Sequence, residues 1–156
     1  MSPGDLVDGT DKTESWSAGV PFQCVPVTGL DALGRARPDL SIWDRTFAEC
    51  DTQWVYLFSR ETDAPDSDIR ARMFAPSMNI IEDPATGATA AAFAGYLAAR
   101  DGTADGTVSW IIEQGVEMGR PSRLHVDVDK HDGALAVVRI GGSTVIVSQG
   151  NFTLPD

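Results

Sequence analysis

Short blocks of hydrophobic residues, each bounded by Gly, Pro, Asp or Ser, recur along most of the chain. Blocks rich in Val, Ile, Phe and Tyr with turn-forming residues at both ends predict β-strands. The expected strands are 22–27, 53–59, 69–75, 107–114, 123–129, 134–140 and 143–147. In 69–75, Arg70 and Arg72 alternate with apolar positions, which predicts one face exposed to water.

The segment 84–100 differs from the rest because it is apolar on nearly every side and crowded with Ala and Gly. A helix without a water-facing side is expected to be buried. Two short helices, 30–36 and 40–49, are expected on either side of Pro38, since proline interrupts a helix. The elements together predict an α+β fold, with a mixed or antiparallel sheet wrapped around a central Ala-rich helix.

The ends and turns of this domain are also suggested by composition. Residues 1–16 are rich in Asp, Thr, Ser and Gly, which indicates a flexible N-terminal lead before a single domain at 17–156. Gly141-Gly142 and 131–133 (HDG) predict hairpin turns. The acidic loop 61–68 lacks the glycine and the spacing of a calcium-binding loop, so a solvated hairpin tip is expected.

Charge limits the classes of partner. The chain has 12 Lys and Arg against 23 Asp and Glu, a net charge of −11. Because no basic cluster is present, we expect neither nucleic acid nor an anionic membrane as a partner. The first residues have no basic or apolar region of the kind found in signal peptides, so the cytoplasm is the expected location.

Cysteine and histidine give no metal motif. Cys24 and Cys50 stand alone, without CxxC spacing, and the chain has two His, so we expect no metal and read both thiols as structural. His125 in an expected strand and His131 in an expected turn are also read as structural.

The start of the Ala-rich helix is where chemistry is expected. Asp83 followed by Pro84 is typical of a helix N-cap and first position. Thr86, Gly87 and Ala88 would then lie in the first turn, whose free N–H groups and positive dipole end can bind a carboxylate or phosphate. Residue types alone leave a second interpretation open, in which Asp83 is only a cap and the small residues only pack.

Several separate motifs, in order from about residue 17 to the C-terminus, resemble the PhzF family of phenazine-biosynthesis-like isomerases. The segment 82–87 (EDPATG) followed by Tyr96-Leu97 is similar to that family's EDPATGSA…YL pattern. The other similar segments are 17–22 (SAGVPF), 72–76 (RMFAP), 113–115 (EQG), 118–122 (MGRPS), 141–142 (GG) and 150–155 (GNFTLP).

This resemblance implies the C-terminal half of a diaminopimelate-epimerase-like fold, in which two similar halves each wrap a sheet around a helix. The active site of the family lies between the halves, at the two helix N-termini. It implies cofactor-independent proton transfer on a small carboxylate substrate by general acid–base catalysis. The glutamate that serves as the acid belongs to the N-terminal half, and no residue of this chain matches it.

Carried onto this sequence, the resemblance implies that Asp83 is the catalytic-site aspartate. Thr86, Gly87, Ala88 and Thr89 would bind the substrate carboxylate. The family has Ser where this chain has Ala88, so one hydroxyl hydrogen bond is missing while the backbone N–H remains.

Three functions follow as hypotheses. The chain is a subunit or fragment of a PhzF-like isomerase that needs a separate N-terminal half and is inactive alone. Alternatively, it is a non-catalytic module that binds small anions, which Ala88 favours. In the third, two copies form a homodimer that imitates the two-half architecture.

Overall fold

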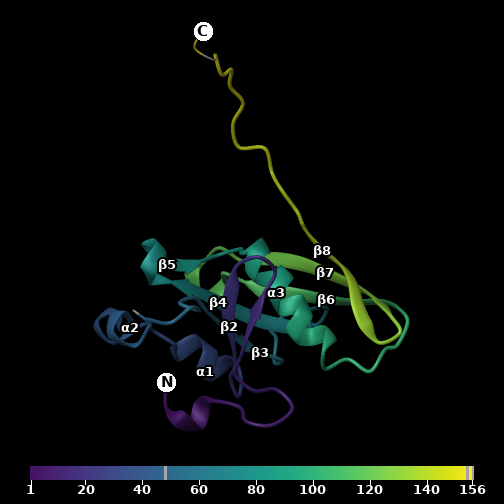
Figure 1. Cartoon of the computed structure of the whole chain (residues 1–156). Helices are drawn as coiled ribbons and strands as arrows, with labels where there is room; N and C mark the ends of the chain where they lie inside the picture. Colours follow the sequence, from purple (N-terminus) through teal and green to yellow (C-terminus); the bar gives the residue numbers. More distant parts are fainter. Residues whose placement is uncertain (48, 154, 156) are drawn as a thin grey trace.

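The computed structural model describes residues 1–47, 49–153 and 155 (Figure 1). The strands are β1 Glu14–Ser17, β2 Pro21–Pro26, β3 Val55–Ser59, β4 Ile69–Ala75, β5 Ile80–Asp83, β6 Gly106–Gln114, β7 Ser122–His131 and β8 Ala134–Gly142. The helices are α1 Leu30–Arg35, α2 Leu40–Phe47 and α3 Gly87–Ala98, with short 3-10 turns η1 Pro3–Asp5, η2 Pro76–Met78 and η3 Val116–Met118. Within these ranges no helix has both the length and the apolar character needed to cross a membrane.

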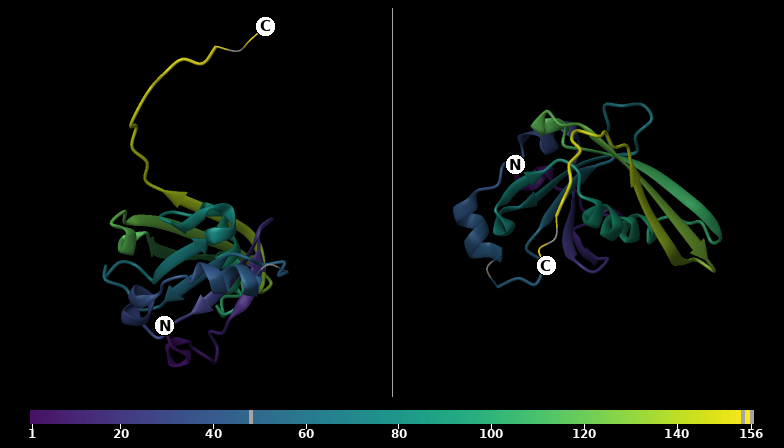
Figure 2. Two further views of the ribbon diagram at one scale, coloured as in Figure 1. Left: turned by 90° about the vertical axis from the view of Figure 1, so that its left-hand side faces the viewer. Right: turned by 90° about the horizontal axis from the view of Figure 1, so that it is seen from above.

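All eight strands belong to one mixed sheet, in the order β1-β2-β3-β4-β6-β7-β8 with β5 also paired to β4. The β2–β3 and β4–β6 pairs are parallel, and the other pairs are antiparallel. The sheet is strongly curved, and α3 lies within the curve, as the view from above shows (Figure 2). Its contacts with β1, β2, β7 and β8 join the two ends of the sheet. The α+β class and the mixed sheet expected from the sequence are confirmed.

Strand β3 separates two hydrophobic cores. All five of its residues are buried, because successive side chains point to opposite faces of a sheet and both faces are covered. Tyr56 and Phe58 pack against Phe93 of α3, with ring centroids 5.2 and 4.7 Å away. Val55 and Leu57 lie in the second core, beneath α1. The aromatic run in the sequence therefore fills both sides of the sheet.

Strand β4 has the bounds expected from the sequence, but the expectation of one wet face is wrong. All seven residues are buried. Phe74 packs in the second core, and Arg72 donates through Nη1 to the backbone oxygens of Leu33 and Ala36, at 2.8 and 3.0 Å. Arg72 is therefore buried beneath α1, and Arg70 is buried in ion pairs with Asp63, Glu113 and Glu117.

Helix α3 is shorter than the expected 84–100. It begins at Gly87, with Thr86 as N-cap, because Asp83 is the last residue of β5 and the two residues after it belong to neither the strand nor the helix. At the other end, the buried Lys130 amine donates to the carbonyl oxygens of Ala98 and Asp101, at 3.1 and 2.7 Å. This cation satisfies carbonyl groups that a helix C-terminus leaves free.

The N-terminal residues are packed against the body, and the expected domain start at residue 17 falls inside β1. Leu6 forms an antiparallel bridge with Val27. Asp11 accepts from Arg60 Nε at 2.5 Å. Trp16 of β1 lies so close to α3 that a Cβ at Gly95 would sit 2.7 Å from its ring. Although the segment 1–16 is polar in composition, Asp5, Asp11 and Glu14 form ion pairs with Arg35, Arg60 and Arg100, which explains why it differs from the flexible lead expected.

Two turn predictions differ in outcome. The turn at 131–133 is confirmed, since it joins β7 to β8 and places Asp132 and Gly133 at positive φ. The hairpin expected at Gly141-Gly142 is wrong, because both glycines continue β8 and pair with His125 and Leu124.

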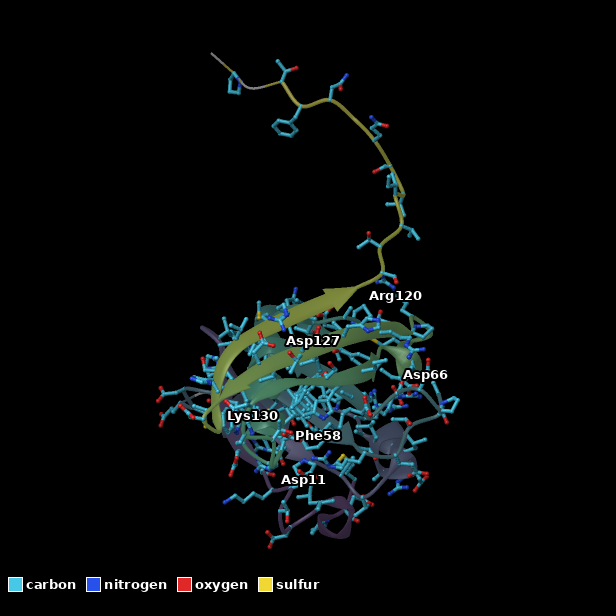
Figure 3. The ribbon with its side chains drawn as sticks, turned by 90° about the vertical axis from the view of Figure 1, so that its right-hand side faces the viewer. Asp11, Phe58, Asp66, Arg120, Asp127 and Lys130 are labelled. Atoms are coloured by element: carbon cyan, nitrogen blue, oxygen red, sulfur yellow. The ribbon has the colours of Figure 1, made fainter. Side chains whose placement is uncertain are left out.

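The strand expected at 143–147 is also absent from the part of the chain that is described. Residues 143–153 leave β8 as an extended tail outside the sheet (Figures 1 and 3). The expected helix 40–49 includes Ala48 and the 150–155 motif includes Leu154, which lie outside the described ranges.

Candidate functional site at the start of α3

Two strands meet end to end beside β4, and this meeting builds the site. Strand β6 runs parallel to the first half of β4, with Gln114 opposite Ala71. Strand β5 runs antiparallel to the second half, with Asp83 opposite Met73. Both strands therefore end at the middle of the same β4 edge, and the register brings Gln114 next to Asp83.

A directed chain of hydrogen bonds connects these ends. The Gln114 side-chain amide donates from Nε2 to the Asp83 backbone oxygen at 2.7 Å and to Thr86 Oγ1 at 2.9 Å. Thr86 Oγ1 in turn donates to Asp83 Oδ2 at 2.5 Å. Gln114 thus holds the backbone of Asp83 directly and its carboxylate through one hydroxyl, which fixes the side chain's orientation.

The far side of Gln114 is tied to the hydrophobic core. Its Oε1 accepts from the Tyr56 hydroxyl at 3.3 Å, and both residues are fully buried. Burial raises the pKa of Tyr56 above its ordinary value, so the hydroxyl remains protonated and able to donate. Tyr56, on the central strand β3, therefore supports the site through Gln114.

Gly115 permits the close approach of the two strand ends. It has φ of +77°, and a Cβ there would lie 2.8 Å from the Pro84 oxygen and 2.5 Å from the Arg120 oxygen. Both the left-handed backbone and the contacts require glycine. The residue after Gln114 therefore helps to position the segment that leads into α3.

The first turn of α3 presents free backbone donors at an open surface. Gly87 and Ala88 are exposed, and nothing lies within 4 Å of the place where a Gly87 Cβ would be. In the described residues, the N–H groups of Gly87, Ala88 and Thr89 have no acceptor. These donors and the positive end of the helix dipole are suited to bind an anion. The Thr89 side chain is fully buried, and its Oγ1 has no partner within the described chain.

Nearby carboxylates are already occupied by arginine. Arg72 donates to Glu82 through Nε at 2.8 Å and Nη2 at 2.7 Å, a bidentate pair next to Asp83. Arg70 Nη1 lies 2.6 Å from Glu113 Oε2. Burial acts to raise the pKa of Glu113, but the hydrogen bonds from Arg70 and from the Ala64 amide outweigh it and keep that pKa below its ordinary value. Glu113 is thus held in an ion pair with Arg70.

The cysteines lie apart from this network. Cys24 is buried, burial raises the pKa of its thiol to about 12, and Cys50 is exposed; both are free thiols. A buried thiol with that pKa is not a nucleophile at neutral pH. The structural reading of Cys24 agrees with this environment.

Two other features lie away from the start of α3. Asp105, His131 and Asp132 offer oxygen or nitrogen atoms within 4.8 Å of one another, but all three are exposed at the β7–β8 turn, and His131 Nδ1 is 3.0 Å from Asp105 Oδ1. A cavity of about 260 Å³ lies between α2 and the sheet, on the face opposite α3. Its lining is largely apolar and includes Trp43, Phe47 and Phe74.

Sequence reasoning located part of the site. It placed Asp83, Thr86, Gly87 and Ala88 at the helix start, and these residues are together there. The expectation that Asp83 is the N-cap is wrong, since Thr86 holds that position. The sequence gives Gln114 only as part of the 113–115 motif, because its contact with Asp83 depends on strand register. The one local signal was a Gln at the end of an apolar strand.

Comparisons with known proteins agree with one another. The model of the family "Phenazine biosynthesis-like protein" (PhzC-PhzF) matches residues 7–150. The uncharacterized isomerase mll1393 of Mesorhizobium japonicum is 40% identical over 97% of this chain and 51% of its own length. The trans-2,3-dihydro-3-hydroxyanthranilate isomerase of Pseudomonas fluorescens is 30% identical, over 96% of this chain and 50% of its own length.

Solved structures give the same result. A PhzF-family phenazine biosynthesis protein of Bacillus anthracis is similar with a TM-score of 0.70 and 26% identity, over 80% of this chain and 42% of that one. One from Enterococcus faecalis has a TM-score of 0.56 at 19% identity, which supports the fold alone. The chain spans about half the length of the curated relatives it matches.

Proposed function

Because the chain belongs to the PhzC-PhzF family of phenazine biosynthesis-like proteins, we propose that it is one lobe of a PhzF-like isomerase. In this proposal it is the C-terminal half of a diaminopimelate-epimerase-like fold, with α3 as the central helix of that half. The relatives of about twice the length support it, and three of them from Pseudomonas are named as isomerases of trans-2,3-dihydro-3-hydroxyanthranilate. The reaction is a proton transfer on a small carboxylate.

The carboxylate of the substrate is held by the first turn of α3. The free N–H groups of Gly87, Ala88 and Thr89 support this role, since they are the donors that the helix itself cannot satisfy. The same donors stabilise negative charge that develops on the substrate during proton transfer. Gly87 and Ala88 contribute no bulk that would keep a ligand away from the backbone.

Asp83 orients the substrate or the group that transfers the proton. The observation that carries this proposal is the hydrogen bond from Thr86 Oγ1 to Asp83 Oδ2, with Gln114 behind both residues. A carboxylate fixed by one oxygen leaves its second oxygen for another partner. For proton transfer, the first requirement is that the participating group lies within hydrogen-bond distance of its partner.

The acid that removes and returns the proton is proposed to lie on a second lobe. Around the start of α3 several large apolar side chains are exposed: Met78, Ile80, Ile81 and Met118. They belong to η2, β5 and η3, the elements next to Asp83 and Gln114. Exposed apolar residues grouped around a site are typical of a docking face. Burial under a second lobe would raise the pKa of that lobe's acid toward a useful range.

The test combines this chain with the part of the Pseudomonas fluorescens isomerase that it does not match. Conversion of trans-2,3-dihydro-3-hydroxyanthranilate in D2O is followed by deuterium incorporation into the product. We expect the mixture to be active, each component alone to be inactive, and Asp83→Asn to lose most of the activity while circular dichroism is unchanged. Full activity of Asp83→Asn would reduce Asp83 to a structural residue.

A second candidate function is a non-catalytic module that binds small anions. Ala88 favours it, because the hydroxyl found in the family pattern is missing at the anion site. Ala88 is exposed, so Ala88→Ser restores the hydroxyl without disturbing packing. An increase in turnover by Ala88→Ser in the same assay supports the isomerase, whereas tighter benzoate binding without turnover in either form supports the module.

A further inference from the structure

Helix α2 covers the second hydrophobic core loosely, in contrast to α1. Helix α1 buries Ala32 and Leu33, whereas no residue of α2 is buried. Trp43 and Phe47 of α2 nevertheless pack against the edge of this core, with their ring centroids 4.8 Å apart. Aromatic side chains that face a core are normally packed tightly into it, because burial of their large apolar surface is favourable. The described chain therefore leaves space between α2 and the strands.

This space is a cavity of about 260 Å³, which we call the α2 cavity. Val55, Leu57 and Phe74 line it from the sheet, and Trp43 and Phe47 line it from the helix. An apolar cavity of about 150 Å³ accommodates benzene, so the α2 cavity has room for one or two aromatic rings. Strands β3 and β4 separate it from α3, as the view from above shows (Figure 2). It is therefore distinct from the candidate site at the start of α3.

One polar group at this cavity has no partner. The indole Nε1 of Trp43 is buried, and the described chain offers it no acceptor. By contrast, Nε1 of Trp16 donates to Glu14 Oε2 at 3.1 Å, and Nε1 of Trp54 donates to Ser77 Oγ at 3.0 Å. A buried indole N–H usually has a partner, because an unsatisfied donor is costly. An occupant that carries an acceptor beside Trp43 satisfies this donor.

The charged side chains that line the α2 cavity, Arg37 and Asp39, carry opposite charges and already have partners. Arg37 Nη1 donates to the backbone oxygens of Gly34 and Ala36, at 2.8 and 2.6 Å. Asp39 Oδ1 accepts from the backbone N–H and the hydroxyl of Ser41, at 3.0 and 2.8 Å. A charged ligand would lose its hydration in this apolar cavity without gaining a free counter-charge. The lining therefore favours a neutral ligand.

We propose that the α2 cavity binds a neutral, flat aromatic molecule of one or two rings that carries a hydrogen-bond acceptor for Trp43 Nε1. Its rings pack between the aromatic residues of α2 and Phe74 of β4, in the offset or edge contacts that aromatic rings prefer. Its acceptor gives specificity, as a few placed polar groups do in a largely apolar pocket. This binding site goes beyond the proposed isomerase function and does not depend on it.

The probes for the experiment are quinoline and naphthalene, which have the same two-ring shape. Only quinoline has an acceptor, its ring nitrogen, and it is neutral near neutral pH. The chain has four tryptophans, and Trp43→Phe identifies the indole N–H resonance of Trp43 in nitrogen-resolved NMR spectra. Quinoline is expected to move this resonance downfield, as a new hydrogen bond does. Naphthalene is expected to move the methyl resonances of Val55 and Leu57 without that downfield shift. If neither probe moves these resonances, the proposal is overturned.

A pair of variants tests the hydrogen bond. Trp43→Phe keeps an aromatic ring at the cavity and removes the donor. It is expected to weaken quinoline binding at least about fivefold and naphthalene binding by less than about twofold. Trp54→Phe is the control, because Trp54 does not line the cavity and its N–H is bonded to Ser77. It is expected to change neither affinity by more than about twofold. Equal losses for the two probes in Trp43→Phe would contradict the role of the indole.

A third variant tests the cavity itself. Thr46 is an exposed residue of α2 that lines the cavity, so Thr46→Phe adds bulk there without replacing a buried side chain. It is expected to weaken binding of both probes at least about tenfold, with the melting temperature of the free chain unchanged. Unaltered binding of both probes by a folded Thr46→Phe variant would place them elsewhere and overturn the proposal.

Other occupants give distinct results. If the Trp43 indole resonance moves with protein concentration alone, together with a dimer in sedimentation, a second copy of the chain fills the cavity. If the unmatched part of the Mesorhizobium japonicum isomerase moves this resonance and abolishes quinoline binding, the cavity is a contact with the second lobe. If quinoline moves only the amide resonances of Gly87, Ala88 and Thr89, it binds at the start of α3. Each of these three results overturns the proposal.

Discussion

The side-chain amide of Gln114 donates to the backbone oxygen of Asp83 at 2.7 Å, across the junction where β6 and β5 end. Gln114 is fully buried, and it makes a second bond to Thr86, which holds the Asp83 carboxylate. One amide group therefore sets both the path of the backbone into α3 and the direction of the Asp83 carboxylate.

Replacement of Gln114 tests this support. Gln114→Leu leaves the Asp83 oxygen and the Tyr56 hydroxyl without partners, so unfolding free energy is expected to fall by about 1–3 kcal/mol. Urea denaturation followed by circular dichroism measures the change. Gln149→Leu, in the exposed tail, is the control and is expected to lie within about 0.5 kcal/mol of the parent. Equal stability of the two variants would show that the network contributes nothing.

Two glycines allow strain and contact to be separated. Gly115 and Gly119 have nearly the same φ, +77° and +70°, but a Cβ meets Pro84 and Arg120 at the first and nothing within 4 Å at the second. Gly119→Ala is expected to cost about 1 kcal/mol from backbone strain alone. Gly115→Ala is expected to cost more, by about 1–3 kcal/mol. Thermal unfolding measures the stability of both variants. Equal losses of stability would show that the backbone around Pro84 moves to accommodate the added Cβ at little cost.

The anion site at α3 can be detected without a second lobe. Titration with benzoate is expected to shift the amide resonances of Gly87, Ala88 and Thr89, because their N–H groups face a carboxylate as free donors. Benzamide has the same shape without the charge and serves as the control. If benzamide shifts the same resonances equally, or if benzoate shifts those around the α2 cavity instead, the helix start is not an anion site.

Acid is expected to weaken the attachment of β1 to α3. The hydrogen bonds from Arg100 and from the Trp16 indole hold the pKa of Glu14 at about 2, against an ordinary 4.5. Since the folded-state pKa is the lower one, this stabilisation is complete above pH 4.5 and is lost as the pH falls toward 2.

The melting temperature of Glu14→Gln is therefore expected to lie below that of the parent at pH 6, with a gap that narrows steadily as the pH falls below 4.5. Asp8→Asn is the matched control, because Asp8 is exposed and belongs to no ion pair within the described ranges. A gap for Glu14→Gln that is independent of pH would contradict the assignment.

Most of the strands could be predicted because β-branched and aromatic runs bounded by turn residues are visible within each segment. The bounds of β4 agree with the sequence, and β3 and β6 begin within two residues of the expected positions. The burial of Arg72 could not be predicted, since it depends on α1, which lies far away in sequence and covers that face. The strand expected at 143–147 failed for the complementary reason: propensity was present, but no edge of the described chain is paired with it.

The site was predicted only where residues are neighbours in sequence. Asp83, Thr86 and Gly87 follow one another, so the helix start was visible from their types. Gln114 lies 31 residues from Asp83 and reaches it because β6 stops opposite Ala71 while β5 stops opposite Met73. Strand register of that kind is a property of the folded sheet and is not written in either segment.

The meeting of β5 and β6 on one edge of β4 has a consequence for how the protein can vary. Both strands are paired with β4 up to Asp83 and Gln114, whereas η2 and η3 are short turns outside this pairing. Substitutions in η2 and η3 are therefore expected to leave Asp83 in place. Changes in the η2 and η3 turns can therefore alter the surface around the site without displacing the strands that hold the Asp83 carboxylate.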